Sequence, residues 1–362
     1  MSLGVISISH LKNYNLLVKL STSIVKDSKE VYLTRRILEP AFSLLATNYH
    51  VSIQQHNRPP TRQELRRNIR NKNGILCTLS DKIDKQVLEE AGPNLKVISS
   101  YSTGYDHIDV REATKRGIFV TTTGDVLAET TADLTFGLIL AISRRIIEAD
   151  EFVRKGWWKL GWMPDLFLGS DVYSSTLGIL GLGRIGSAVA RRAQGFNMNI
   201  IYHNRHRLDK GLEARLGIKY AELNEVLKRS DFLTIHTGLN QDSFNMIGKR
   251  ELSKMKKTAY IINTARGDII NENDLAETLR KKWIAGAALD TYTREPLTKS
   301  NKLSRLKNVI LLPHIGSASI NTRIKMSRIA AQNMINVLEG KDPIYSVNSQ
   351  AIHMSSRKLP EK

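Results

Sequence analysis

The feature that most constrains the fold of this 362-residue chain is a glycine pattern between a strand-like run and a helix-like run. The apolar run Leu177–Leu182 leads into Gly181, Gly183 and Gly186, and Ser187–Gln194 favours a helix before a second apolar run. This order predicts one β-α-β unit of a dinucleotide-binding domain, with phosphates at the helix N-terminus. The alternative is a glycine-rich turn that binds no nucleotide.

The composition is that of a globular chain with a basic balance. Lys and Arg number 54 against 35 Asp and Glu, for a net charge of +19, and the length suits about two domains. The basic clusters at 62–72, 249–257 and 280–282 follow amphipathic patterns, so we predict solvated faces rather than a nucleic-acid interface. A single cysteine, Cys77, excludes an internal disulfide. No apolar run approaches the roughly 18 residues that cross a bilayer, so we predict no membrane partner.

The first 29 residues precede the first strand-like run and are predicted to form an N-terminal extension. Residues 1–26 contain three lysines and no acidic residue, which is compatible with a mitochondrial presequence or with a loosely packed extension. The same residues contain no arginine, which favours the extension. We therefore expect a cytoplasmic protein, with a mitochondrial location as the alternative.

Alternating apolar and polar stretches between residues 31 and 120 predict a small α/β domain with a largely parallel sheet. The apolar runs are Val31–Thr34, Val51–Gln54, Gly74–Leu79, Val97–Ser100 and Phe119–Val120. Loops at 77–81 and 102–107 follow two of these strands and therefore lie where α/β proteins place ligands. Thr103 and Gly104 can offer consecutive backbone N–H groups to a carboxylate, and a plain turn is the alternative.

A mostly apolar segment, Leu127–Ile147, is predicted to be a long helix and the hinge between the domains. Three of the four tryptophans follow it, at Trp157, Trp158 and Trp162. Such a loop is either a core plug or a subunit contact, because exposed tryptophans usually mark interfaces.

The turn after the second strand of the β-α-β unit indicates which nicotinamide cofactor binds. An NAD site requires a carboxylate here for the ribose 2′-hydroxyl, and the first acid is Asp209. Arg205 and Arg207 flank the turn instead, as a 2′-phosphate requires. The turn therefore predicts NADPH as the preferred cofactor, with NADH possible. The alternative is two arginines in a surface turn of a basic chain.

Four later strand-like runs each end in polar residues. The runs are Phe232–Thr237, Ala259–Asn263, Ala285–Leu289 and Val309–Leu312. Arg266, Glu295 and His314 follow these runs, and parallel strands bring such ends to one edge of the sheet. Carbonyl reduction needs these groups, because a guanidinium polarises the carbonyl, an imidazolium donates the proton and a carboxylate orients the imidazole. Taken singly, Arg266 has the alternative of a surface arginine, Glu295 that of a loop acid and His314 that of a buried histidine.

These segments resemble the D-isomer-specific 2-hydroxyacid dehydrogenases, and within them the reductases of glyoxylate and hydroxypyruvate. The resemblance covers about Glu30–Ser346 and is carried by VISSYSTGYDHID, DVLAETTADL, GILGLGRIGSAVARR, INTARGDIIN, ALDTYTREPL and LPHIGSAS. It implies a Rossmann-type doubly wound parallel sheet domain at 127–318. It also implies a smaller flavodoxin-like α/β substrate domain, discontinuous at 30–126 and 319–345. Residues 346–362 are expected as a C-terminal tail.

The resemblance also implies roles for individual residues. Arg266 binds and polarises the substrate, Glu295 partners the histidine, and His314 is the acid/base. Further substrate contacts are implied at Thr103, Gly104, Asp290, Ser317 and Trp162. Cofactor contacts are implied at Gly181, Gly183, Arg184, Ile185, Gly186, Arg205, His206, Arg207, Gly238, Thr264, Asp290 and Gly316. Trp162 matches a tryptophan that reaches the partner subunit's active site, so a homodimer is implied, and no metal site is expected.

Two alternatives stay open at this point. Another enzyme of the family, such as a 3-phosphoglycerate dehydrogenase, would normally carry an acid at the end of the second strand. A corepressor-like protein that senses the cofactor on the same fold can retain a similar Arg-Glu-His set. The arginine turn favours the reductase over both.

Overall fold

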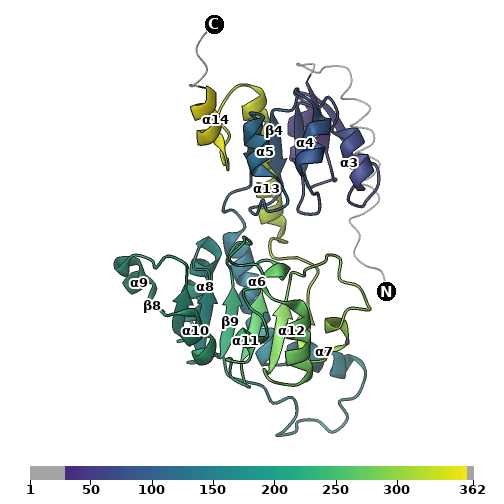
Figure 1. The fold of residues 1–362 in the computed structure, drawn as a ribbon. Coiled ribbons are helices and arrows are strands. Elements are labelled where there is room, and N and C mark those ends of the chain that lie inside the picture. Colours follow the sequence, from purple (N-terminus) through teal and green to yellow (C-terminus); the bar gives the residue numbers. More distant parts are fainter. Residues whose placement is uncertain (1–28, 357–362) are drawn as a thin grey trace. The chain divides into compact units, whose positions relative to one another are not determined.

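The computed structural model of the protein describes residues 29–356, which divide into two compact α/β units (Figure 1). Unit 1 consists of the chain up to Val126 and from Ser319 onward, and unit 2 is Leu127–Ala318. The expected N-terminal extension with its presequence alternative, and the last six residues, lie outside the described residues. No helix within residues 29–356 has the length and apolar character needed to span a membrane.

Unit 1 is built on a five-stranded parallel sheet with the order β2-β1-β3-β4-β5. Its strands are β1 Glu30–Leu33, β2 His50–Ile53, β3 Gly74–Cys77, β4 Val97–Ser100 and β5 Phe119–Thr121. Its helices are α2 Ala41–Ala46, α3 Arg62–Asn68, α4 Lys85–Ala91, α5 Val110–Lys115, α13 Ile320–Leu338 and α14 Ser349–Ser356. This strand order is that of flavodoxin-like domains, which confirms the predicted smaller fold.

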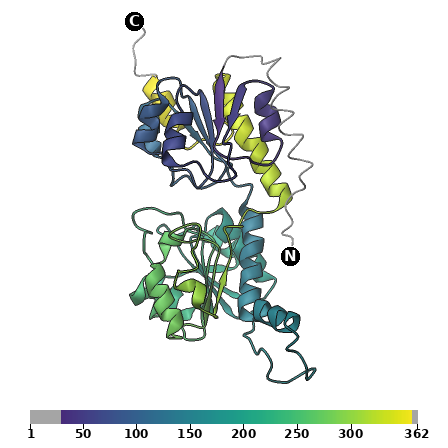
Figure 2. The same ribbon diagram turned by 90° about the vertical axis from the view of Figure 1, so that its right-hand side faces the viewer.

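Helices cover both faces of the unit 1 sheet. α3, α4 and α5 pack on one face, and α2 and α13 pack on the other (Figure 2). The central strands β3 and β4 are therefore buried on both sides, and Ser99 and Ser100 of β4 are buried together with its apolar residues. α13 belongs to unit 1 although more than 190 residues separate it from β5, because its buried stripe packs against β3 and β4.

Unit 2 is a seven-stranded parallel sheet with the order β12-β11-β10-β9-β6-β7-β8. Its strands are β6 Thr176–Leu180, β7 Asn199–His203, β8 Ile218–Tyr220, β9 Phe232–Ile235, β10 Tyr260–Asn263, β11 Gly286–Leu289 and β12 Val309–Leu311. The chain winds outward in both directions from β6, so the strand order reverses between β6 and β9. Ligands bind at such a switch point in doubly wound folds, and the predicted Rossmann-type domain is confirmed.

The helices of unit 2 form two layers. They are α6 Ala128–Ser143, α7 Ile146–Arg154, α8 Arg184–Gln194, α9 Lys210–Leu216, α10 Leu223–Arg229, α11 Lys249–Leu252 and α12 Glu272–Arg280, with short 3-10 helices η2 Gly267–Ile269 and η3 Leu303–Arg305. α6 and α8 cover one face, and α10, α11 and α12 cover the other. Each face has its own apolar cluster, so the sheet carries the core of the unit.

The structure differs from the sequence predictions at two helices. The single helix expected over 127–147 is two helices, because Arg145 adopts a left-handed φ of 54° and turns the chain between α6 and α7. The expected tail from 346 is wrong for its first part, because residues 349–356 form α14. Asn348 anchors this segment, since its side chain donates to the Ile118 carbonyl and accepts from the backbone N–H of Val120. Ile352 is buried on unit 1.

Candidate active site

The glycine turn after β6 has the geometry of a dinucleotide cradle. Gly181 has a φ of 92°, and a Cβ on it would lie 2.4 Å from the backbone N of Thr237. A Cβ on Gly186 would lie 2.3 Å from the carbonyl oxygen of Gly181. Gly183 is the N-cap of α8, and no atom lies within 4 Å of the position that its Cβ would take. Close backbone packing thus requires glycine at 181 and 186. Gly183 leaves the N-terminus of α8 accessible, and such a helix N-terminus is suited to binding a pyrophosphate.

The two arginines after β7 have different partners. Arg205 is 70% exposed and forms an ion pair with the equally exposed Asp242, with 2.9 Å between Nη1 and Oδ2. Arg207 donates two hydrogen bonds to Glu213, at 2.8 and 2.7 Å, and the hydroxyl of Tyr202 donates to the same carboxylate at 2.7 Å. These bonds from Arg207 and Tyr202 lower the pKa of Glu213 to about 2. Arg207 is therefore held by an internal carboxylate, whereas Arg205 lies at the surface.

His314 and Glu295 form a direct pair after β12 and β11. The Nδ1 atom of His314 lies 2.8 Å from Oε2 of Glu295, and Oε1 of Glu295 accepts from the backbone N–H of Tyr292 at 3.2 Å. Because a carboxylate only accepts, the imidazole carries a proton on Nδ1 in this pair. The ring is thereby oriented with Nε2 as the remaining position for acid or base chemistry.

The loop that carries His314 is fixed by a buried carboxylate. Asp290 is fully buried at the end of β11, and its two oxygens accept from the backbone N–H groups of Ile315 and Gly316, both at 2.7 Å. Burial raises the pKa of Asp290 above its ordinary value, while these two bonds act in the opposite direction. Thr131 on α6 donates to the carbonyl of Gly316 at 3.1 Å. The loop of His314 is therefore held by Asp290, which follows β11, and by Thr131 on α6.

Arg266 follows β10 in a loop that is closed by its own side chains and packed on the Glu295 loop. Asn263 donates to the carbonyl of Arg266 at 2.8 Å and accepts from the N–H of Ala265 at 2.9 Å. A Cβ on Gly267 would lie 1.9 Å from the carbonyl carbon of Tyr292, so only glycine allows this close approach. Since β10, β11 and β12 are neighbours in the sheet, the loops of Arg266, Glu295 and His314 share one edge of unit 2.

A chain of threonine hydroxyls, which was not predicted from the sequence, joins two of these loops. The hydroxyl of Thr264, after β10, lies 3.0 Å from the hydroxyl of Thr135 on α6. Thr135 also donates to the carbonyl of Thr131, which bonds the His314 loop at Gly316. The signal was present at the DVLAETTADL segment and the residue that follows it, since Thr131 lies one helical turn before Thr135.

The remaining predicted contacts are distributed over both units. Gly238 follows β9 in unit 2, and its carbonyl accepts from Ser243 at 2.8 Å. Three other predicted cofactor positions lie in unit 2: Arg184 and Ile185 begin α8, and His206 lies in the turn after β7. The predicted substrate contact Ser317 lies in the His314 loop. Thr103 and Gly104 follow β4 in unit 1, where the Thr103 hydroxyl donates to the carbonyl of Gly124. Each unit thus carries its own part of the predicted set.

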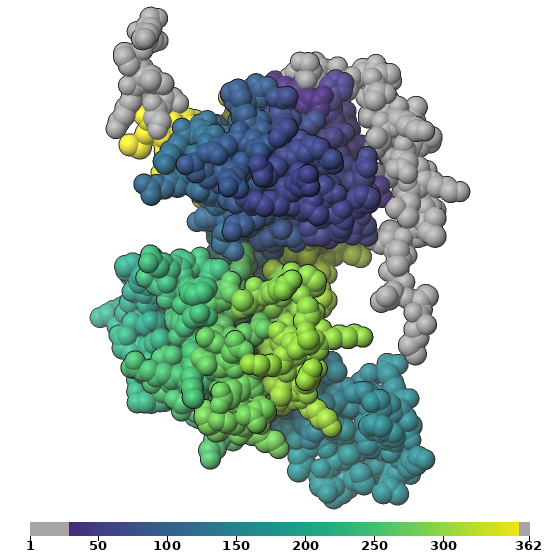
Figure 3. Space-filling model, turned by 45° about the vertical axis from the view of Figure 1, so that its right-hand side comes forward, coloured from purple at the N-terminus to yellow at the C-terminus, as the bar shows by residue number. Residues whose placement is uncertain are grey.

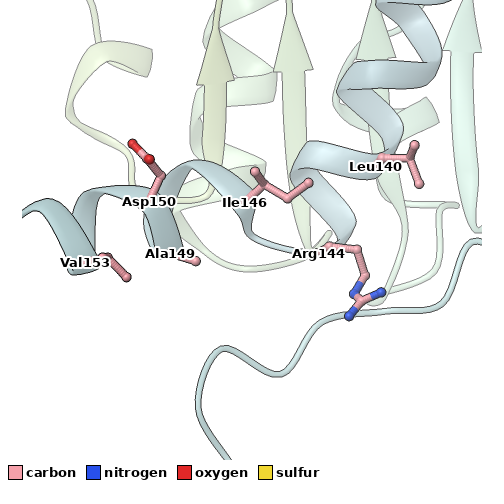
Figure 4. Close-up of a pocket in the computed structure, with 6 residues that line it drawn as sticks. All are labelled: Leu140, Arg144, Ile146, Ala149, Asp150 and Val153. Atoms are coloured by element: carbon pink, nitrogen blue, oxygen red, sulfur yellow. The ribbon is translucent and has the colours of Figure 1, made fainter. Parts of the chain in front are cut away.

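The tryptophan loop and α7 form an exposed apolar surface on unit 2, drawn in teal at the lower right of Figure 3. None of the residues of α7 is buried. We call this the α7 surface; its exposed apolar residues are Ile146, Ile147, Val153, Trp157, Trp158, Leu160, Trp162 and Leu168. A groove of about 700 Å³ lies along it, lined by Leu140, Arg144, Ile146, Ala149, Asp150 and Val153 (Figure 4). Trp162 is 84% exposed, which excludes the core-plug alternative for its loop.

Comparisons of this chain with a family model and with curated relatives point to the same family. The family model described as D-isomer specific 2-hydroxyacid dehydrogenase, NAD binding domain, matches residues 136–316. A glyoxylate reductase of Thermofilum pendens is 45% identical over 324 residues, which cover 89% of this chain and 95% of that protein. A glyoxylate reductase of Thermococcus litoralis is 44% identical over 329 residues, covering 90% and 98% of the two chains.

Solved structures agree with this family. The crystal structure of an NADPH-dependent glyoxylate/hydroxypyruvate reductase from Sinorhizobium meliloti, in complex with NADP and malonate, is similar with a TM-score of 0.78 and 30% identity. The match covers 89% of this chain and 97% of that one. With the glycine cradle and the oriented histidine, these matches show that the chain belongs to the D-isomer-specific 2-hydroxyacid dehydrogenase family and is an NAD(P)-dependent oxidoreductase acting on CH–OH groups.

Proposed function

We propose that this protein is an NADPH-preferring reductase of small 2-oxo acids, which converts glyoxylate to glycolate and hydroxypyruvate to D-glycerate. The observation that carries the proposal is the 2.8 Å pair of His314 and Glu295 on the sheet edge that also carries Arg266. The relatives named glyoxylate reductase, at 44–45% identity over about nine-tenths of this chain, support this substrate class.

In the proposed reaction, three side chains of unit 2 act on the 2-oxo acid. Arg266 binds the substrate carboxylate and polarises the adjacent carbonyl, since a guanidinium is suited to two-point contact with oxygen atoms. His314 donates the proton from Nε2 to the carbonyl oxygen while Glu295 holds the ring through Nδ1. The bound nicotinamide supplies the hydride that the carbonyl carbon receives. The carbonyl thus gains one hydride and one proton and becomes the hydroxyl of a 2-hydroxy acid.

The cofactor is proposed to lie on the glycine cradle with its adenosine ribose at the turn after β7. The positions of Gly181, Gly183 and Gly186 support this site, because their packing leaves the α8 N-terminus accessible. The proposed preference for NADPH rests on Arg205, whose exposed guanidinium suits a 2′-phosphate. The Sinorhizobium enzyme, crystallised with NADP, supports the same choice.

We further propose that the α7 surface is covered by a second copy of this chain. Exposed tryptophans at this density are rare on monomers and typical of subunit contacts. The loop of Trp162, which resembles the family segment that reaches a partner's active site, extends from this surface. Light scattering of the full chain tests the proposal: a mass of twice 40.8 kDa is expected, and a monomer at micromolar concentration would contradict it.

Nicotinamide absorbance tests the reaction directly. The purified chain is assayed with NADPH or NADH against glyoxylate, hydroxypyruvate, pyruvate and 3-phosphohydroxypyruvate. We expect turnover of glyoxylate and hydroxypyruvate, and His314→Ala should lower kcat by about 10²- to 10⁴-fold. Turnover of the phosphorylated acid alone would indicate a 3-phosphoglycerate dehydrogenase instead. Cofactor binding without turnover of any acid would favour the corepressor-like alternative.

A further inference from the structure

Three side chains at the end of β4 in unit 1 form a continuous chain of hydrogen bonds that ends on Gly104. Nε2 of His107 lies 3.1 Å from Oγ of Ser100, and Oγ of Ser100 lies 2.6 Å from Oγ of Ser102. The hydroxyl of Ser102 donates to the carbonyl oxygen of Gly104 at 2.6 Å. Ser100 is fully buried and Ser102 is 3% exposed, so bulk water does not substitute for these bonds. We call this chain the serine relay.

The number of protons fixes the direction of the serine relay. A carbonyl oxygen only accepts, so Ser102 uses its single hydroxyl proton on Gly104. The bond between the two serines must then be donated by Ser100, whose only proton is used in turn. The bond between Ser100 and His107 must therefore be donated by the ring, which requires a proton on Nε2. This requirement holds whether or not Nδ1 also carries a proton.

The immediate surroundings of His107 do not disturb this direction. Sγ of Cys77 lies 3.9 Å from Nε2 of the ring, which is longer than the 3.1 Å to Ser100. Burial raises the pKa of the Cys77 thiol well above its usual range, so the sulfur stays neutral beside the relay. The shorter oxygen contact is thus the acceptor for the Nε2 proton.

The relay and a second bond hold the 103–104 backbone from two sides. Ser102 fixes the carbonyl of Gly104, and the hydroxyl of Thr103 is fixed on the carbonyl of Gly124. The orientation of the intervening peptide, and hence of its N–H, follows from these two anchors. Donors held in place before a ligand arrives need no reordering on binding, and a chain of aligned hydrogen bonds strengthens each member.

We propose that His107 is a positioning residue that acts through Ser100 and Ser102 to orient the Thr103–Gly104 backbone toward a small carboxylate ligand. The inference rests on the proposed function together with the substrate contact that the family resemblance implies at Thr103 and Gly104. It adds to that function the source of the loop's rigidity and the protonation state of His107. A purely structural role would instead stabilise unit 1 without affecting substrate affinity.

The first experiment tests the direction of the relay without using activity. Long-range ¹H–¹⁵N correlation spectra of the uniformly labelled full chain report which ring nitrogen carries the proton, and the signals lost in His107→Gln assign His107. The relay requires a protonated Nε2. A neutral ring with its proton on Nδ1 alone would overturn the inference, whatever the protein catalyses.

The second experiment separates positioning from stability. Ser102→Ala is expected to raise the KM for glyoxylate by about 5- to 20-fold, the effect of one lost hydrogen bond in the binding loop, with kcat changed less than about 3-fold. NADPH affinity should stay unchanged, because the glycine cradle belongs to unit 2. His107→Phe should match this effect, and His107→Gln should restore a low KM because an amide N–H replaces the Nε2 donor.

Ser99→Ala is the matched control. Ser99 is also fully buried on β4, and it donates to the carbonyl of Ala330 on α13 at 2.8 Å, on the opposite face of the sheet from the relay. It should lower Tm about as much as Ser102→Ala while leaving KM unchanged. Equal KM values in Ser99→Ala and Ser102→Ala, or a His107→Gln that behaves like His107→Phe, would refute the positioning role. An unsubstituted enzyme without glyoxylate turnover would refute the proposed function instead, and the ring protonation would still decide the relay.

Discussion

The two arginines after β7 allow a sharp test of cofactor choice, because the structure gives them different partners. Arg205 pairs with the exposed Asp242, and Arg207 is held by the nearly buried Glu213. A 2′-phosphate can displace the exposed Asp242 from Arg205 more readily than it can displace the nearly buried Glu213 from Arg207. We therefore predict that Arg205→Ala lowers the preference for NADPH, whereas Arg207→Ala acts mainly on stability.

The size of the effect follows from two opposing contributions. A charge-assisted contact between Arg205 and the 2′-phosphate is worth about 1.5–3 kcal/mol. Making it requires breaking the pair with Asp242, and exposed pairs contribute about 0–1 kcal/mol. The net gain of about 0.5–3 kcal/mol corresponds to a preference for NADPH of about 2- to 150-fold. Arg205→Ala should lose this factor, and Asp242→Asn should increase it by up to about 5-fold, because the competing carboxylate is removed.

The measurement is the ratio of kcat/KM for NADPH to that for NADH at saturating glyoxylate, with thermal unfolding of each variant beside it. Arg205→Ala and Asp242→Asn should leave Tm unchanged, because both side chains are about 70% exposed. Equal kcat/KM values for both cofactors in the unsubstituted enzyme would refute the reasoning. So would an Arg207→Ala variant that loses the preference at unchanged Tm.

Three further predictions concern the catalytic edge and the β7 turn. Glu295→Gln should lower kcat by about 10²-fold or more at unchanged NADPH affinity, because the Nδ1 proton of His314 loses its carboxylate partner. Arg207→Met should destabilise the protein at neutral pH. Arg207 is the largest cause, with Tyr202 the next, of the lowering of the Glu213 pKa from 4.5 to about 2, so in urea unfolding the difference between variant and unsubstituted protein should vanish as pH falls from about 4.5 to about 2. Gly267→Ala should lower Tm by several degrees and abolish turnover, because its Cβ would lie 1.9 Å from the backbone of the Glu295 loop.

Matched substitutions show whether these effects are specific. Gly195→Ala places the same methyl group at the C-cap of α8, where φ is −63° and the nearest atom lies 3.4 Å away, so Tm and kcat should stay unchanged. Lys228→Met removes an exposed cation with an i,i+3 acidic partner and should not change the acid profile. A Gly267→Ala variant with normal activity would contradict the packing that we describe between the two loops.

The geometry of the glycine turn and the shared edge of the strand-end loops were predictable, because local chain chemistry fixes both. Gly181 and Gly186 were predictable because a tight turn and a close helix–strand approach each exclude a side chain. His314 and Arg266 were placed on one edge because parallel strands end on the same side of their sheet. In both cases the spacing along the chain determines the arrangement in space.

The parts that escaped prediction depend on contacts between distant segments. The break between α6 and α7 at Arg145 interrupts a mostly apolar segment, and neither proline nor glycine stands at the break. The folding of the expected tail depends on Asn348, which bonds residues about 230 positions earlier. The different roles of Arg205 and Arg207 depend on Glu213, which the pattern of the turn does not include. Such pairings follow only from the assembled fold.

Asp290 and Glu295 make different contacts with the His314 loop. Asp290 and Glu295 lie 24 and 29 residues after Arg266, and the resemblance implies Glu295 as the partner of His314. The structure selects Glu295, because both oxygens of Asp290 already accept backbone N–H groups of the His314 loop. Asp290 comes directly after β11 and is fully buried, so it fixes backbone, whereas Glu295 lies further along the loop and reaches the ring. Burial thus commits Asp290 to the backbone of the loop and leaves Glu295 to pair with the His314 ring.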